Sequence, residues 1–319
     1  MKQQKVSREN EIASIIEIIN NVDRYKENSL NGLVILLNGN WGTGKTTFIE
    51  ELIENIREQE NMELFNLYNA YENDCYENAY IPFFASIAEK IQLQESFTGF
   101  IKSIVAGSTT GLSVCAVSVA RNFMKNAFKV DINEVAQDLK DSLEEYNDDY
   151  LSDYMNFQEH KKYIKQKMLD ACSKKPQIFI IDELDRCKPN FAMDTLEIVK
   201  HFFDIKNCIF IISVDKLQLE ESIKAVYGNG INSTKYFSKL FDYQYNLLPI
   251  NFYDAVEGLE EIEFSKELIE RATNLFNYLN ISLRDSKKIF NDFISKFNNW
   301  TIEQSLFMLF LFILKYARH

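Results

Sequence analysis

The feature that most constrains the fold of this chain is a short glycine-rich stretch between an apolar run and an amphipathic pattern. Residues 39–46 read G-N-W-G-T-G-K-T and fit the pattern G-x-x-x-x-G-K-[ST] at every fixed position. The apolar run at 33–37, just before it, predicts a buried parallel strand. After it, apolar side chains recur at helical spacing over residues 48–56. The sequence therefore predicts a strand, a glycine loop and a helix in direct succession.

This succession suits the phosphates of a nucleotide. Glycines let successive backbone N–H groups curve around an anion, and the helix N-terminus adds the positive end of its dipole. We expect Lys45 to neutralise the β- and γ-phosphate oxygens and the Thr46 hydroxyl to ligate Mg²⁺. A chance match in a glycine turn is the alternative, which the flanking strand and helix disfavour. The expected nucleotide-binding residues of the loop are Gly39, Asn40, Trp41, Gly42, Thr43, Gly44, Lys45, Thr46 and Thr47.

A phosphate loop requires a second element, which is an apolar strand that ends in a carboxylate. The run I-F-I-I at 178–181 predicts a central strand, and Asp182 and Glu183 follow it directly. Ligands of parallel sheets bind at the carboxyl ends of strands. We expect Asp182 to hold Mg²⁺ through water and Glu183 to act as the base that orients and deprotonates an attacking water. The alternative is a strand that simply ends in a solvated turn.

Composition restricts the partners and the compartment. The formal net charge of −12 gives no general attraction to nucleic acid or to anionic lipid. The five cysteines form no C-x-x-C pair and the three histidines lie far apart, so no zinc site is indicated. No secretory signal opens the chain, and a reducing cytoplasm is the expected location.

The rest of the chain predicts an α/β domain followed by helices. Further strands are predicted at 62–67, 208–215 and 243–248, and residues 191–203 predict a crossover helix. In additional-strand P-loop ATPases the strand at 208–215 would offer Ser213 or Asp215 to the γ-phosphate, unless it is an ordinary strand end. We expect a nucleotide-binding core at 1–250, with an insert at about 97–130, and a helical lid at 251–319. The apolar run at 306–314 is too short to cross a bilayer and predicts a packed core helix.

Four further segments carry a family resemblance. Residues 181–189 read I-D-E-L-D-R-C-K-P, and 210–218 read F-I-I-S-V-D-K-L-Q. Residues 236–242 read Y-F-S-K-L-F-D, and 283–291 read L-R-D-S-K-K-I-F-N. With the tryptophan-containing loop, this ordered set resembles the KAP-type P-loop NTPases over nearly the whole chain. The second acid of that family's D-D-L-D-R-C signature is a glutamate here, which keeps the carboxylate, and leucine replaces its proline at 283.

The resemblance implies a fold and roles for three more residues. It implies an additional-strand sheet in the order 5-1-4-3-2 with helices on both faces, and ATP as the nucleotide. Asp185 would tune Glu183 or hold its loop, and Arg186 would act as an arginine finger in cis or in trans. An ion pair with a purely structural role is the alternative for both residues. Arg284 resembles a lid arginine that reaches the γ-phosphate; the alternative is an ordinary charge on a helix surface.

Many KAP members carry transmembrane segments between the two nucleotide motifs, and residues 103–120 of this chain lie in that interval. These eighteen residues contain no charge, but they are rich in glycine, serine and alanine and poor in leucine. Such a composition favours close helix packing or an oligomer contact over insertion into a bilayer. A bilayer span, or contact with the membrane surface, is the alternative.

The expected function is an ATP-hydrolysing switch or assembly factor that acts on a partner protein or on further copies of itself. Two alternatives are a P-loop phosphotransferase and a nucleotide-gated scaffold with little turnover. The carboxylate of Glu183 favours activation of water over both. The family resemblance also implies membrane-linked signalling or, in bacteria, defence against phage.

Overall fold

The fold was analysed in a computed structural model of the 319-residue chain. The structure describes residues 8–22, 32–75, 79–88, 162–202, 204–248, 250, 252–253, 266–279, 281–294, 304, 307–311 and 313. The chain divides into two compact units. We call Ile16–Leu37 with Asn55–Tyr245 the sheet unit, and Met1–Ile15 with Asn38–Glu54 and Asn246–His319 the loop unit.

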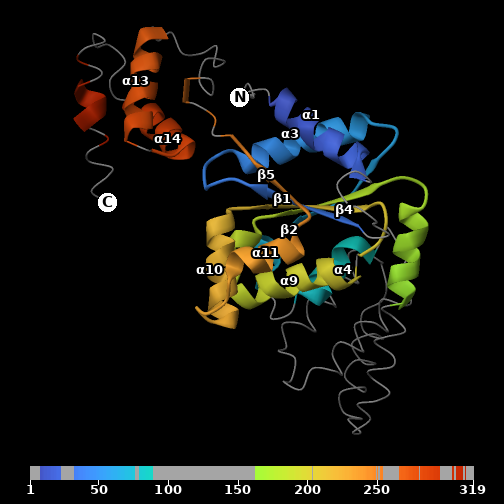
Figure 1. The fold of residues 1–319 in the computed structure, drawn as a ribbon. Helices are drawn as coiled ribbons and strands as arrows, with labels where there is room; N and C mark the ends of the chain where they lie inside the picture. The colour runs from blue at the N-terminus through green and yellow to red at the C-terminus, as the bar shows by residue number, and fades with distance from the viewer. Residues whose placement is uncertain are drawn as a thin grey trace, which may run out of the picture. The chain divides into compact units, whose positions relative to one another are not determined.

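A five-stranded parallel sheet forms the centre of the sheet unit (Figure 1). Its strands are β1 (Leu33–Asn38), β2 (Glu63–Asn69), β3 (Gln177–Asp182), β4 (Cys208–Val214) and β5 (Tyr243–Asn246). The order across the sheet is β2-β3-β4-β1-β5. Strand β3 pairs in parallel with β2 and with β4. The predicted fold class and the 5-1-4-3-2 strand order are therefore confirmed.

The sequence of each strand matches its place in the sheet. Every residue of β3 and β4 is buried, as expected for central strands that are covered on both faces. The edge strand β2 mixes buried and exposed residues, and the short strand β5 at the other edge has no buried residue. An aromatic stack crosses the three strands at one end of this order: the ring centroids of Phe65 and Phe179, and of Phe179 and Phe210, are each 4.7 Å apart.

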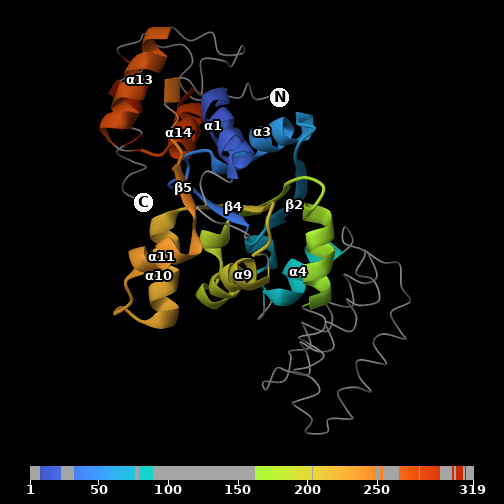
Figure 2. The same ribbon diagram turned by 45° about the vertical axis from the view of Figure 1, so that its right-hand side comes forward.

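Four helices cover one face of the sheet in both views (Figures 1 and 2). They are α4 (Tyr80–Ala88), α9 (Pro189–Phe202), α10 (Lys216–Tyr227) and α11 (Ser233–Leu240). Helix α9 begins at Pro189, because proline has no N–H to lose at the first helical position. A helix at residues 162–172 leads into β3 and buries Ile164, Met168 and Cys172 in the same core.

The loop unit holds the glycine loop and the C-terminal helices. Helices α1 (Glu9–Asn20) and α3 (Lys45–Glu58) begin in this unit. Helices α13 (Lys266–Tyr278) and α14 (Leu283–Ile294) pack with C-terminal residues around a second hydrophobic core. That core includes Leu309 and Ile313, so the apolar run at 306–314 contributes buried residues, as its length predicts.

One expectation of the sequence lies outside the described residues. The insert at 97–130, and with it the segment 103–120, falls in a range that the structure does not describe. Within the described part of the chain no helix is long and apolar enough to cross a bilayer. The division into a core at 1–250 and a lid at 251–319 stays a prediction.

The aromatic stack gives a test of the sheet. We expect Phe179→Ala to lower the free energy of unfolding by about 3–5 kcal/mol, because it leaves a cavity beside Phe65 and Phe210. Chemical denaturation followed by circular dichroism measures this loss. Leu67→Ala on β2 is the matched control, since Leu67 is 50% exposed and its truncation should cost little. Equal losses for the two variants would contradict the described packing.

Candidate functional site

The phosphate loop follows β1 and ends where α3 begins, in the loop unit. Gly42 and Gly44 have φ angles of +86° and +82°. Residues other than glycine are strained in this left-handed region, so the backbone itself requires glycine at both positions, of which Gly44 is a fixed position of the motif and Gly42 a variable one. The loop is closed by the Thr43 hydroxyl, which donates to the carbonyl of Asn40 at 2.8 Å. The N–H of Phe48 donates to the carbonyl of Gly44 at 3.0 Å and starts the helix.

The loop carries a cation, a hydroxyl and an indole side chain within a few residues of one another. The Lys45 ammonium donates to the carbonyl of Gly39 at 2.5 Å, which folds it back over the loop. Thr46, the first residue after the motif lysine, is exposed. Trp41 is 52% exposed and leaves its ring accessible beside the glycines. Charge, hydroxyl and backbone donors are thus gathered on one short turn.

The predicted lid arginine lies near this turn, within the same unit. A Cβ built on Gly42 would lie 3.1 Å from the Cβ of Ser282 and 3.6 Å from the Cβ of Arg284. Ser282 caps α14: its hydroxyl accepts from the N–H of Asp285 at 3.2 Å. A side chain at position 42 would therefore press against the start of α14. Arg284 is exposed, and its Cβ lies beside the phosphate loop.

The carboxylates of the sheet unit stand at the end of β3. Asp182 is 7% exposed and lies in register with Asn69 of β2 and with Ser213 of β4. Its carboxylate accepts from the N–H of Glu183 at 2.9 Å, and its carbonyl accepts from the N–H of Ala70 at 3.0 Å. Three polar residues from neighbouring strands therefore meet at the carboxyl end of this part of the sheet.

Glu183 adopts a left-handed conformation, with φ 61° and ψ 24°. This conformation costs a non-glycine residue about 1–2 kcal/mol and needs local support. The Asp182 carboxylate supports this conformation through the N–H of Glu183, and two contacts support it through the carbonyl of Glu183. The N–H of Arg186 donates to that carbonyl at 3.2 Å, and the Cys187 thiol lies 3.6 Å from it. The turn directs the Glu183 side chain away from the strand direction.

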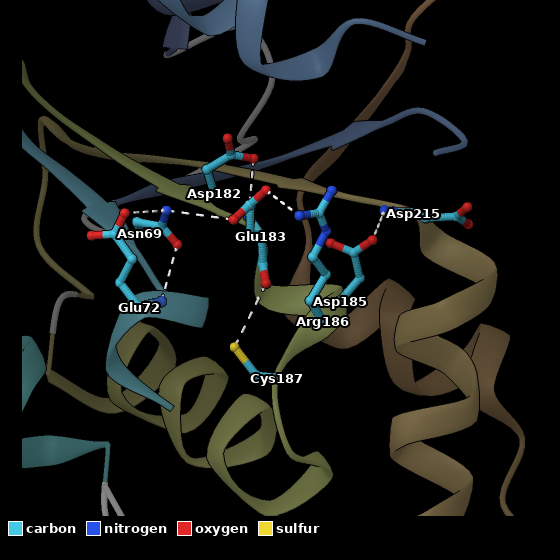
Figure 3. Close-up of polar contacts among 8 residues, drawn as sticks. All are labelled: Asn69, Glu72, Asp182, Glu183, Asp185, Arg186, Cys187 and Asp215. Carbon is cyan, nitrogen blue, oxygen red and sulfur yellow. Dashed lines mark hydrogen bonds and ion pairs between the residues drawn. The ribbon is translucent and has the colours of Figure 1, made fainter. Parts of the chain in front are cut away.

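The Glu183 carboxylate is held by two side chains (Figure 3). One oxygen pairs with Nη1 of Arg186 at 2.7 Å, and the other accepts from Nδ2 of Asn69 at 3.4 Å. Asn69 also donates to Glu72 at 3.1 Å. The Glu183 side chain remains 21% exposed and that of Arg186 33% exposed. The acid is thus positioned but accessible.

The carboxylates of Asp185 and Asp215 accept hydrogen bonds from backbone N–H groups near this turn. Asp185 is 8% exposed and accepts from the N–H of Asp215 at 3.1 Å. The Asp215 carboxylate accepts from the N–H of Leu217 at 3.1 Å and so caps α10. Of the two functions expected for Asp185, the geometry favours holding the loop. Of the two residues expected near the γ-phosphate, Ser213 is the fully buried one, and its hydroxyl has no hydrogen-bond partner among the described residues.

Asn69 is the functional candidate that sequence reasoning missed. The predicted second strand ended at Leu67, whereas β2 continues to Asn69. The signal that could have found it is the same one that found Asp182, namely a polar residue at the carboxyl end of a parallel strand. Its importance follows from register, because pairing Asn69 with Asp182 brings the amide to the Glu183 carboxylate.

The parallel sheet, the phosphate loop and the carboxylates at the end of β3 define the class of protein as a P-loop α/β domain. A family model described as the KAP family P-loop domain matches residues 8–295. The chain therefore belongs to the KAP family of P-loop NTPases, and membership supports nucleotide binding, typically with Mg²⁺.

The solved structure of the Aeropyrum pernix ORC2 protein in ADPNP–ADP complexes is similar to this chain, at 11% identity and a TM-score of 0.46. The match covers 92% of this chain and 66% of that one. No curated protein sequence matches this chain.

The left-handed turn leads to a test at Cys187. Burial, together with Asp74 and Asp185, raises the pKa of the Cys187 thiol to about 12. Thiolate forms only as the pH approaches that value, so at pH 8 about one thiol in ten thousand is reactive. We expect iodoacetamide to modify the exposed Cys75 far faster than Cys187, as followed by peptide mass spectrometry. Equal rates would contradict the described turn.

Proposed function

We propose that this chain binds ATP with Mg²⁺, hydrolyses it, and acts as a nucleotide-driven switch or assembly factor. Lys45 would neutralise the terminal phosphates, and the loop N–H groups would bind the phosphate oxygens. By their places in the two motifs, Thr46 and Asp182 would each offer an oxygen of the kind that a hard cation such as Mg²⁺ prefers. Arg284 would approach the phosphates from the start of α14.

The residues fit such a ligand on two independent grounds. The left-handed glycines give the loop backbone the shape that a phosphate needs, at φ angles of +86° and +82°. The buried Ser213 hydroxyl, in register with Asp182, lacks a hydrogen-bond partner among the described residues. A buried hydroxyl without a partner is costly, and a water of a Mg²⁺ shell at the neighbouring Asp182 would satisfy it.

The observation that carries hydrolysis is the position of Glu183. Its carboxylate lies one residue beyond the expected Mg²⁺ ligand, is fixed by Asn69 and Arg186, and remains partly exposed. A fixed and accessible carboxylate is suited to orient water and to accept its proton. A phosphotransferase would direct the phosphate to a second substrate, and no described residue favours that reading.

A second candidate function is a nucleotide-gated scaffold with little turnover. It is favoured by the ion pair between Glu183 and Arg186, because a carboxylate oxygen held at 2.7 Å by a guanidinium is already engaged and less available to orient water. The two functions differ in turnover alone, since both require nucleotide binding. The variants below distinguish them.

The output of the switch is also part of the proposal. Residues 251–319 would act as a lid on a core at 1–250, and a homo-oligomer or a partner protein would receive the signal. We propose a cytoplasmic setting and, by the association of the family, a contribution to phage defence. No partner among nucleic acids is proposed, because the net charge is −12.

Glu183→Gln tests the base. We expect ATP affinity to be retained and the hydrolysis rate to fall by roughly 10²–10⁴, because the amide keeps the shape but cannot accept a proton. Isothermal titration and phosphate release measure the two quantities. Glu72→Gln is the matched control, since Glu72 also contacts Asn69 but lies outside the proposed chemistry. Lys45→Ala should abolish binding. Turnover by Glu183→Gln at the wild-type rate would show that Glu183 is not the base and make Asp185 the next candidate, whereas a wild-type chain that binds ATP with little turnover would support the scaffold.

Arg186→Ala tests the guanidinium. We expect hydrolysis to slow more than binding weakens, because an arginine that stabilises transition-state charge contributes little to the ground state. If Arg186 acts in trans, mixing this variant with Lys45→Ala should restore part of the activity. Lys224→Ala, which removes an exposed ion pair with Glu221 of the same length, is the control. Equal losses of binding and turnover, without restoration, would assign Arg186 to a structural ion pair.

A further inference from the structure

Arg8 is a buried arginine at the start of the described chain. It precedes α1, and its carbonyl accepts from the N–H of Ile12 at 2.9 Å. Only 5% of the residue is exposed, and its guanidinium carbon lies 5.8 Å from the centre of the Phe48 ring. Burying a guanidinium is costly unless its N–H groups are bonded. Its partners therefore indicate why an arginine is placed here.

Two backbone carbonyls, from distant parts of the loop unit, accept from the same nitrogen of Arg8. Nη2 donates to the carbonyl of Thr43 in the phosphate loop at 2.8 Å. It also donates to the carbonyl of Leu248 at 3.1 Å. Leu248 lies in the stretch that follows β5 and leads toward α13 and α14. A single side chain thus bridges the phosphate loop and the approach to the C-terminal helices.

Glu11 completes a closed set of contacts. Its carboxylate pairs with Nη1 of Arg8 at 3.3 Å and accepts from the N–H of Leu248 at 3.0 Å. Arg8 and Glu11 therefore hold both the N–H and the carbonyl of Leu248 from one turn of α1. This arrangement fixes the backbone at 248 in orientation as well as in position.

The bond to Thr43 has a consequence for the phosphate loop. The carbonyl of Thr43 and the N–H of Gly44 belong to one planar trans peptide, so they point in opposite directions. By fixing the carbonyl, Arg8 also fixes the direction of the Gly44 N–H. That N–H is one of the backbone donors that the motif presents to phosphate. Arg8 thus acts on the loop without needing to touch the nucleotide.

We propose that Arg8 is a positioning residue that sets the Thr43–Gly44 peptide for phosphate binding and couples it to the backbone at Leu248. This inference rests on the proposed nucleotide binding. It adds that binding is coupled to the backbone at Leu248, in the stretch that leads to the C-terminal helices. Nucleotide that tightens the peptide also tightens the contacts of Arg8 with Leu248 and Glu11. An arginine is required because its planar guanidinium can contact Thr43, Leu248 and Glu11 in one fixed geometry. A lysine has a single ammonium group on a flexible side chain.

The first test measures affinity. We expect Arg8→Gln to weaken ATP binding about tenfold by isothermal titration, which corresponds to about 1.4 kcal/mol. Arg271→Gln is the matched control, since it removes an arginine of the same unit that forms an exposed ion pair with Glu267. The control should bind as the wild type does. Thermal unfolding without nucleotide verifies that both variants are folded.

The second test measures coupling, which a merely structural effect would leave unchanged. Hydrogen exchange is followed at the amides of 44–48 and at Leu248, with and without saturating Mg²⁺–ATP. In the wild type and in Arg271→Gln we expect nucleotide to slow exchange at both places. In Arg8→Gln and Arg8→Lys it should slow exchange at 44–48 alone.

The outcomes separate this inference from the proposed function. Suppose that the wild type binds ATP, and that Arg8→Gln has the same ATP affinity and the same nucleotide-dependent protection at Leu248. This result would overturn the coupling by Arg8 and leave nucleotide binding intact. If Arg8→Lys showed the wild-type slowing of exchange at Leu248, the requirement for the arginine guanidinium would also be overturned. A wild-type chain that binds no nucleotide would overturn the proposed function itself.

Discussion

The hydrogen bond from the N–H of Glu183 to the carboxylate of Asp182 is the interaction on which the carboxylate site depends. It supports a left-handed residue immediately after a fully buried strand. Without such a turn the chain would continue in the strand direction. The Glu183 side chain would then not lie between Asn69 and Arg186. The left-handed conformation of Glu183 costs on the order of 1–2 kcal/mol, and it orients the Glu183 carboxylate toward these two side chains.

The same turn explains why several neighbouring residues have structural rather than chemical functions. Cys187 contacts the carbonyl of Glu183, and its raised pKa keeps the thiol protonated. Asp185 bonds to the backbone of Asp215, which in turn caps α10. These contacts link the end of β3 to the end of β4. The signature D-E-L-D-R-C therefore combines residues that face the proposed chemistry with residues that fix the backbone behind them.

The sequence was informative where one local pattern determines the outcome. The glycine loop, the apolar strand before Asp182 and the crossover helix predicted at 191–203 each follow from a local pattern, and the structure contains all three, the helix as α9 at Pro189–Phe202. The strand order followed from family resemblance, because no local pattern states which strands are neighbours. Asn69 was missed because its position depends on register with β3. Arg8 was missed because its partners lie 35 and 240 residues away in the sequence.

The long separation between Arg8 and Leu248 has a consequence for synthesis of the chain. The phosphate loop emerges from the ribosome early, but Leu248 emerges about 240 residues after Arg8. At roughly 5–20 residues per second this interval lasts on the order of tens of seconds. During it the Arg8 guanidinium and the Glu11 carboxylate lack their shared backbone partner. A nascent chain therefore carries a complete glycine motif well before Leu248 emerges, and under the proposed coupling the loop lacks part of its support during this interval.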